Sequence, residues 1–322
     1  MVTGTSGTKE EHVSTTIPQR EHTAERLLAA SAKHSFDPEV DVDWDAPLAD
    51  GKYFVPEHRV TLYGSPLWEQ MSHQQRVDLS RHEAASMASV GIWFELILMQ
   101  MLVRHAYDRD PRSQHVRYAL TEIADECRHS VMFARMIDTL GCPAYGPGPY
   151  AHRLGRLIKT VSFGAETFAA ILIAEEILDT MQREMMADET IQPLVRRISR
   201  IHVIEEARHV RYAREELTRQ MEGISRPKRA MTRLVVARSA HVIATRLVHE
   251  DCYAAVGLDP EVARRAAAAN PYRRETLAWA GARLVGFFTE LGLVAGPGRR
   301  LWHRAGLLPD RPGSGPETGT AV

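Results

Sequence analysis

The chain has 322 residues, of which 44% are hydrophobic and 25% are charged. These values are ordinary for a soluble globular protein and exclude disorder of the whole chain. Lys and Arg number 40 against 41 Asp and Glu, so the basic excess that accompanies nucleic-acid binding is missing. Three cysteines without a CxxC pair exclude a disulfide framework, and we expect a reducing, cytoplasmic location.

The two ends of the chain differ in composition from its middle. Residues 1–35 begin with a polar run rich in Thr and Ser, and we expect a disordered or loosely ordered N-terminal arm. Residues 310–322 are expected to form a disordered tail for the same reason. Residues 36–309 are expected to form a single all-α domain, although prolines and glycines make residues 36–68 irregular.

From residue 69 onward, helical periodicity is interrupted by proline and glycine breakers, and no stretch has the period of a strand. One segment, residues 84–103, is apolar enough for a membrane helix, but Glu95 lies near its centre. We interpret it as a helix buried in a bundle. The predicted helices span roughly residues 73–107, 112–140, 150–188, 190–222, 227–257, 260–269 and 271–294.

Two similar pentapeptides carry the chemistry of the sequence, Asp-Glu-Cys-Arg-His at 125–129 and Glu-Glu-Ala-Arg-His at 205–209. Each contains Glu-x-x-His, which places a carboxylate and an imidazole on one helix face. Glu95 precedes the first motif's glutamate by 31 residues, and Glu175 precedes the second motif's glutamate by the same number. Two such helix pairs would bring four Glu and two His together, as in carboxylate-bridged di-metal bundles.

Further candidates lie beside the second motif. His202 lies four residues before Glu206 and seven before His209, so the three share one stripe of a helix. His202 is therefore a candidate third imidazole ligand, with a hydrogen-bonded histidine as the alternative. Asp125 and Glu205 directly precede the motif glutamates and are suited to hydrogen-bond the histidine N–H groups, with a solvated helix face as the alternative.

With these motifs the chain resembles the AurF-like family, the di-iron p-aminobenzoate N-oxygenases, over roughly residues 75–220. The family's H-x-x-x-E-x-x-H motif matches residues 202–209, its other ExxH motif matches residues 126–129, and its Ala-Glu context matches residues 174–175. Arg283 is the candidate contact for a substrate carboxylate. The resemblance implies a ferritin-like four-helix di-metal bundle with extra C-terminal helices, whose metal ligands would be Glu95, Glu126, His129, Glu175, His202, Glu206 and His209.

The resemblance also implies two iron ions, with manganese as the other metal that suits this ligand set, and O2 as cosubstrate. The implied reaction is N-oxygenation of a small arylamine, from amine towards hydroxylamine, nitroso and nitro, through a peroxo di-iron intermediate. Electrons are expected from a separate reductase, because the chain has no GxGxxG or flavin signature. A homodimer is implied by the resemblance alone, and no nucleic-acid or membrane partner is expected.

Three other interpretations stay open. The chain could be a di-iron C-hydroxylase or desaturase of another small substrate, a non-enzymatic iron-binding or ferroxidase bundle, or a helical bundle without metal. A storage bundle needs little beyond four helices, whereas 101 residues follow Met221 here. Trp93, Phe94, Leu98 and Phe168 are expected to line a pocket beside the metals or to be plain core.

Overall fold

The computed structural model describes residues 11–309, with side chains from residue 19 onward. Residues 1–10 of the expected arm and the expected tail at 310–322 lie outside this range. Within residues 11–309 there is no β-strand, and a single isolated bridge joins Tyr53 to Ile191. The all-α prediction is confirmed.

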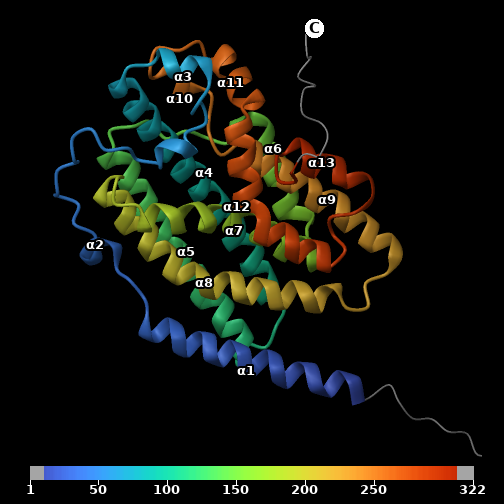
Figure 1. Ribbon diagram of the computed structural model, residues 1–322. Helices are drawn as coiled ribbons and strands as arrows, with labels where there is room; N and C mark the ends of the chain where they lie inside the picture. Colours follow the sequence, from blue (N-terminus) through green and yellow to red (C-terminus); the bar gives the residue numbers. More distant parts are fainter. Residues whose placement is uncertain (1–10, 310–322) are drawn as a thin grey trace, which may run out of the picture.

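Four long helices form a bundle at the centre of the molecule. They are α4 (His73–Tyr107), α5 (Gln114–Thr139), α7 (Ala165–Ala187) and α8 (Pro193–Met221). α4 packs along α5 and α7 packs along α8, so the bundle consists of two helical hairpins (Figure 1). Contacts of α5 with α8 and of α4 with α7 join the hairpins. The two halves of the sequence repeat are therefore the two hairpins.

Helix α4 contains the apolar segment that resembled a membrane span. Ser72 begins the helix with a capping box, in which its hydroxyl accepts from the Gln75 backbone and the Gln75 side chain accepts from the Ser72 backbone. The helix is long and apolar enough to cross a membrane, yet half of its most apolar window is buried inside the protein. Core helices have the same length and composition, and the buried Glu95 lies on this one.

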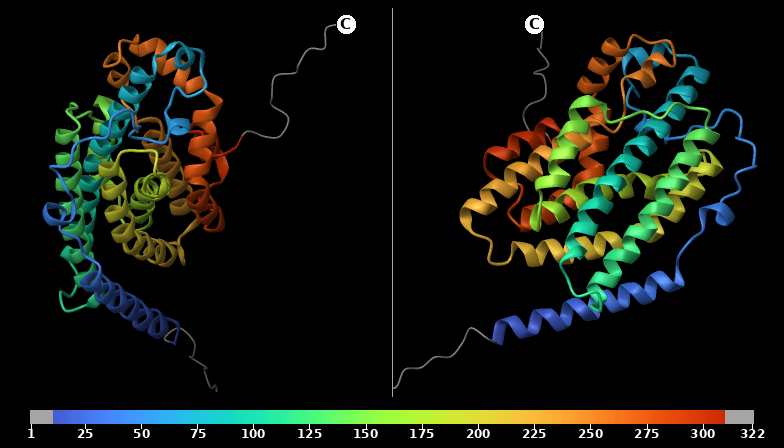
Figure 2. Two further views of the ribbon diagram at one scale, coloured as in Figure 1. Left: turned by 60° about the vertical axis from the view of Figure 1, so that its left-hand side comes forward. Right: turned by 180° about the vertical axis from the view of Figure 1, so that it is seen from behind.

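The C-terminal helices cover one side of the bundle. α9 (Arg226–Thr245) and α12 (Pro271–Glu290) pack on α7, α13 (Arg299–Arg304) packs on α9, and α6 (Gly148–Val161) packs on α4. Figure 2 shows these layers from two further sides. The shorter elements are α2 (Pro38–Asp41), η1 (Glu57–Arg59), α3 (Pro66–Gln70), α10 (Asp251–Ala254), α11 (Pro260–Ala269) and η2 (Gly296–Gly298).

Two predicted helices are each divided in the structure. The segment predicted at 150–188 breaks between α6 and α7, where Gly164 has φ of +63°. A left-handed residue cannot continue a right-handed helix, and glycine adopts this conformation without steric cost. The segment predicted at 227–257 ends as α9 at Thr245 and resumes as the short α10.

The N-terminal arm contains a long helix, α1 (Glu11–Lys33), so the expectation of disorder or loose order is wrong for its described part. Figures 1 and 2 show α1 lying across one end of the bundle. Arg20 donates to both carboxylate oxygens of Glu216 on α8, at 2.9 and 2.7 Å, and Glu21 accepts from the Gln114 backbone at 2.6 Å. The arm is thus ordered by contacts with α5 and α8 that its composition does not reveal.

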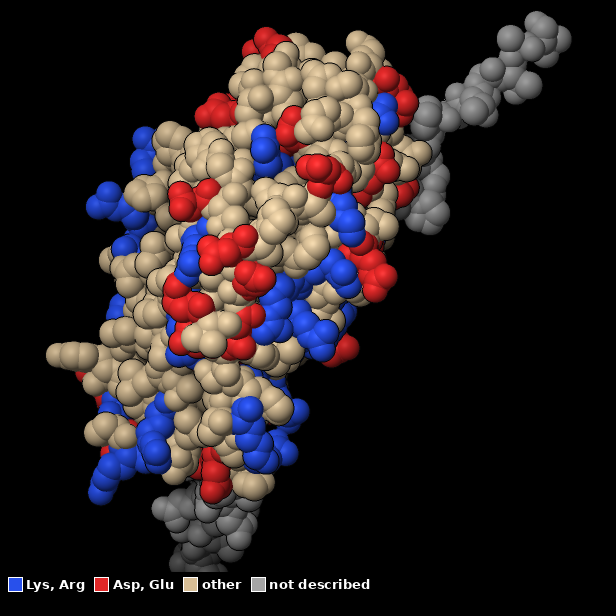
Figure 3. Space-filling view, turned by 90° about the vertical axis from the view of Figure 1, so that its left-hand side faces the viewer, with Lys and Arg blue, Asp and Glu red and all other residues tan. Residues whose placement is uncertain are grey.

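The surface charge is mixed on the face shown in Figure 3. Basic and acidic side chains are interspersed there over largely uncharged surface. A net charge of −1 for the whole sequence agrees with this pattern. This face carries no stripe of a single sign.

Candidate metal centre

The seven predicted ligands meet inside the bundle, two or more helical turns from either end. Each is at most 3% exposed. Their ligand atoms form three overlapping groups within 4.8 Å, namely Glu126, His129, Glu206 and His209; Glu95, His129 and His202; and Glu175, His202 and Glu206. The repeat therefore folds into a single cluster of carboxylates and imidazoles.

Two glutamates and two histidines form the middle of the cluster. His209 Nδ1 lies 2.9 Å from Glu206 and 3.0 Å from Glu126. His129 Nδ1 lies 3.1 Å from Glu126 and 3.4 Å from Glu206. Each imidazole thus faces both carboxylates. In this arrangement two carboxylates can bridge a pair of ions while each histidine binds one of them.

The outer nitrogen of each histidine is held by the opposite hairpin. His129 Nε2 donates to Glu205 of α8 at 2.8 Å, and His209 Nε2 donates to Asp125 of α5 at 3.2 Å. Arg208 lies 3.4 Å from Asp125 and 3.8 Å from Glu205, and so bridges both carboxylates. These contacts fix the tautomer that leaves both Nδ1 atoms free to bind metal.

We predict that Asp125→Asn weakens metal binding by about 10- to 100-fold, because the amide cannot orient and polarise the His209 imidazole as the carboxylate does. Metal affinity is measured by competition with a chromophoric chelator. Asp138→Asn, at an exposed position of the same helix, is the control and should bind metal like the parent. Equal affinities of the parent and the Asp125 variant would contradict the orienting role.

His202 and the two glutamates of α4 and α7 complete the cluster. His202 Nε2 lies 3.7 Å from both Glu95 and Glu206, and neither of its ring nitrogens has a hydrogen-bond partner among the described residues. Ser130 donates to Glu95 at 2.6 Å and leaves the other oxygen of that carboxylate facing His202. A buried imidazole without a partner is costly unless an ion fills the gap.

Burial and crowding shift the protonation of the cluster in opposite directions. Burial raises the pKa of Glu95. Burial also raises the pKa of Glu175, and the nearby charges of Glu206 and Glu126 raise it further. Burial alone would lower the pKa of His129 and His209, but the surrounding carboxylates hold both pKa values well above the usual value. Protons therefore hold the cluster together when cations are absent.

Two buried carboxylates beside the cluster have different surroundings. Glu176, next to the predicted ligand Glu175, accepts a bidentate pair of bonds from Arg214 at 2.7 and 2.5 Å. Glu122, the first-half counterpart of His202, is fully buried, and both its oxygens lack a partner among the described residues. Its position one turn before Glu126 marks it in the sequence, but only the structure reveals that it is unpaired.

The residues present fit a pair of metal ions. One oxygen each of Glu126 and Glu206 lacks a hydrogen-bond partner in the described range, as do both nitrogens of His202. Carboxylate oxygens together with imidazole nitrogens suit iron or manganese. The cluster is therefore able to hold two such ions with ligands from all four bundle helices.

A cavity lies beside the cluster in the bundle interior, and we call it the inner cavity. Its wall includes a residue three or four positions from a cluster residue on each helix: Gly91 on α4, Phe133 on α5, Leu178 on α7 and Ile198 on α8. It encloses about 470 Å³ of empty space, part of it open to solvent. The other lining residues are Ala84, Met87, Ala88, Met136, Met181, Gln182, Met185, Val195 and Ser199.

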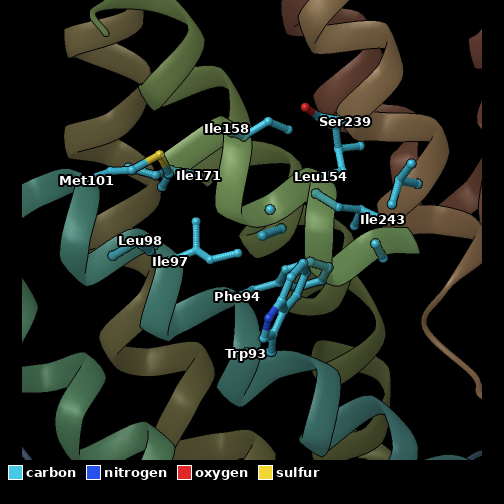
Figure 4. Close-up of a pocket in the computed structure, with 15 residues that line it drawn as sticks. Trp93, Phe94, Ile97, Leu98, Met101, Leu154, Ile158, Ile171, Ser239 and Ile243 are labelled. Carbon is cyan, nitrogen blue, oxygen red and sulfur yellow. The ribbon is translucent and has the colours of Figure 1, made fainter. Parts of the chain in front are cut away.

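Three of the four residues expected to line a pocket or to be plain core do line a cavity. Trp93, Phe94 and Leu98 line a separate apolar cavity between α4, α6, α7 and α9 (Figure 4). Phe168 does not line it and packs as fully buried core against His105. This cavity touches two of the four ligand helices, α4 and α7, whereas the inner cavity touches all four.

Arg283, the candidate for a substrate carboxylate, is exposed on α12 and lines none of the described cavities near the cluster. Arg59 and Arg273 line an outer cavity that shares Met87, Met181 and Met185 with the inner one. The described cavities therefore give no support to a substrate contact by Arg283, because α12 places this residue at the surface.

The family model of p-aminobenzoate N-oxygenase AurF matches residues 17–292, which include the whole bundle. The chain belongs to this family. The matched residues include the metal cluster and the lining of the inner cavity, and the family is described as p-aminobenzoate N-oxygenase.

Individual relatives are more distant. Uncharacterized protein Rv0885 of Mycobacterium tuberculosis and Uncharacterized protein Mb0909 of Mycobacterium bovis are each 28% identical to this chain over 211 residues. The match covers 63% of this chain and 62% of each relative, so the chain spans less than two thirds of their length.

Among solved structures, an R2-like ligand-binding oxidase with an aerobically reconstituted Mn/Fe cofactor aligns with a TM-score of 0.45 and 13% identity, over 94% of both chains. A mutant of such an oxidase, with an anaerobically reconstituted Mn/Fe cofactor, aligns with a TM-score of 0.44 and 13% identity over 93% of this chain and 95% of the other.

Proposed function

We propose that this protein is a di-metal, O2-dependent oxygenase that oxidises the amine nitrogen of a small arylamine, with iron as its metal. The observation that carries the proposal is the buried cluster of seven ligand residues with the inner cavity beside it, where Phe133 of the cavity wall packs on His202 of the cluster. Membership of an N-oxygenase family supports the amine as the reacting group.

The chain's own residues divide the work between the cluster and the cavity. Glu126 and Glu206 would bridge the two ions, Glu95 and Glu175 would be terminal ligands, and His129, His209 and His202 would supply nitrogen. A bound pair of such ions supplies electrons to dioxygen. Phe133, whose ring centroid lies 5.0 Å from that of His202, and Leu178 form the apolar floor on which an aromatic ring would rest.

The apolar floor also excludes water from the reacting end of the substrate. Water exclusion strengthens the electrostatic contacts of the cluster and limits side reactions of dioxygen. Oxygenation consumes two electrons and two protons for each oxygen atom inserted, so a separate reductase is part of the proposal. A cytoplasmic homodimer is proposed with it from the family resemblance.

The test begins with protein loaded anaerobically with ferrous iron. We expect about two irons per chain, oxygen uptake that depends on an added arylamine, and N-oxygenated products that carry label from isotopically labelled dioxygen. Oxygen uptake without organic product would indicate a ferroxidase. Label in a ring or alkyl carbon would indicate C-hydroxylation, and an unsaturated product would indicate a desaturase.

A further inference from the structure

The inner cavity follows one face of α7 from Leu178 past Gln182, in the direction that leads away from Glu175 of the metal cluster. Leu178 lies three residues after Glu175, and Gln182 lies seven residues after it, on the same helix face. Seven residues correspond to about 10 Å along a helix. A benzene ring with substituents at opposite positions covers a comparable length. A substrate whose amine faces the cluster therefore places its far substituent near Gln182.

The wall of the inner cavity carries no charged side chain. Its polar groups are Gln182 and Ser199, and the Ser199 hydroxyl contacts the Met185 sulfur at 3.9 Å. An ionised carboxylate placed here would lose its hydration without gaining a cation, which is costly. The cavity is therefore built for an uncharged molecule.

The charged side chains of the neighbouring outer cavity are Arg59, Glu83, Glu184 and Arg273. Arg59 donates to Glu184 at 2.8 and 3.1 Å and lies 3.8 Å from the centre of the Trp279 ring. Glu83 accepts from the Thr61 backbone at 3.1 Å. Recruiting Arg59 for a substrate anion would break its pair with Glu184, and Arg273 lines the outer cavity but not the inner one.

Gln182 is a polar residue in the mainly apolar wall of the inner cavity. Its side-chain carbonyl oxygen is buried and has no hydrogen-bond partner among the described residues. Buried carbonyl oxygens are normally satisfied, so an unpaired one at a cavity wall indicates a place for a ligand donor. Only an N–H or O–H group can satisfy this oxygen.

We propose that the substrate is a neutral arylamine whose far end carries a hydrogen-bond donor, and that Gln182 selects it by accepting that hydrogen bond. The proposal rests on the proposed function for the amine at the metal cluster. It differs from recognition of a carboxylate by arginine, because the cavity offers an acceptor in place of a cation.

Three ligands of similar size separate charge from hydrogen bonding at the end opposite the amine: the amide of p-aminobenzamide is neutral and donates, the ester of methyl p-aminobenzoate is neutral and only accepts, and the carboxylate of p-aminobenzoate is charged. Calorimetry with the anaerobic ferrous protein measures binding without turnover. We expect the amide to bind about tenfold more tightly than the ester, the effect of one buried hydrogen bond. We expect the carboxylate to bind more than about 100-fold more weakly than the amide.

Variants assign the effect to Gln182. Gln182→Leu should reduce the affinity for the amide to that for the ester, because both then meet an apolar wall. Gln182→Glu keeps a hydrogen-bond acceptor of the same size, so it should retain the affinity for p-aminobenzamide and weaken the binding of p-aminobenzoate further. Gln100→Leu, on the exposed side of α4, is the matched control and should keep the parent order of affinities.

The outcomes separate this inference from the proposed function. Tightest binding of the carboxylate, an amide preference that survives in Gln182→Leu, or no binding of any of the three would overturn the inference. If the affinity order holds but no arylamine gives an oxygen-dependent product, the proposed function fails and the cavity assignment stands. If arylamines are oxidised with the carboxylate preferred, the function stands and the inference fails.

Discussion

Glu126→Ala is expected to abolish the di-metal centre. Glu126 faces both His129 and His209, at 3.1 and 3.0 Å, so its removal deprives both ion positions of a shared ligand. An outer partner of a metal ligand already contributes about 10- to 100-fold to affinity or activity. We therefore expect the bound metal to fall from about two ions per chain to less than one, and arylamine oxidation to fall by more than about 100-fold.

Metal content is measured by elemental analysis after anaerobic loading with ferrous iron and removal of excess metal. Glu215→Ala on α8 is the control, because Glu215 pairs with Arg211 and Arg219 at the half-exposed edge of that helix. It should retain both ions. Two ions per chain in Glu126→Ala would contradict the assignment of Glu126 as a metal ligand. If the parent protein binds no metal, the sequence repeat has a structural role alone.

Removal of the metals is expected to reverse the pH dependence of stability. Ligands must lose protons to bind metal, so the loaded protein gains stability as pH rises. An ion present at about 1,000 times its dissociation constant adds about 4 kcal/mol to the free energy of unfolding. The metal-free protein should instead lose stability between about pH 5 and pH 8, because its cluster is held by protons.

The direction follows from each group in the metal-free cluster. Burial raises the pKa of Glu95, Glu122 and Glu175, so above the unfolded pKa the folded chain keeps protons that the unfolded chain releases, and stability falls as pH rises. The raised pKa values of His129 and His209 act in the same direction. Each histidine contributes its full stabilisation below the pKa it has in the unfolded chain and loses it as pH rises through its pKa in the folded chain.

Two glutamates act in the opposite direction but outside this window. Burial would raise the pKa of Glu126 and Glu206, yet the His209 imidazole and its neighbours hold both below the usual value. The two carboxylates contribute their full stabilisation above the pKa that they have in the unfolded chain. They lose it only as pH falls through their lower pKa in the folded chain. Urea midpoints at several pH values, with and without metal, measure the effect, and parallel curves would contradict the prediction.

The sequence predicts the metal cluster well because its spacing reflects helix geometry. Glu-x-x-His must place both side chains on one face, and a constant interval of 31 residues returns the chain to the same level of a hairpin. His202 is found by the same stripe argument. All of these positions converge in the structure, whereas their binding of metal stays a prediction.

Other features depend on contacts between distant segments and are not visible in the sequence. The inner cavity combines side chains from four helices, so Gln182 has no local signature. Helix α1 has a polar sequence, and its order depends on partners such as Glu216 of α8. Arg283 was chosen from its local sequence alone, and the orientation of α12 turns it to the surface.

The crossed hydrogen bonds of the two histidines have a consequence for how metal enters and leaves. Asp125 of α5 holds the histidine of α8, and Glu205 of α8 holds the histidine of α5. Neither hairpin alone can therefore orient its own imidazole, and separation of α5 from α8 would release both histidines at once. Such separation is a rare opening of the core. A weaker contact between the two hairpins should therefore speed the loss of both ions together, rather than the loss of one of them.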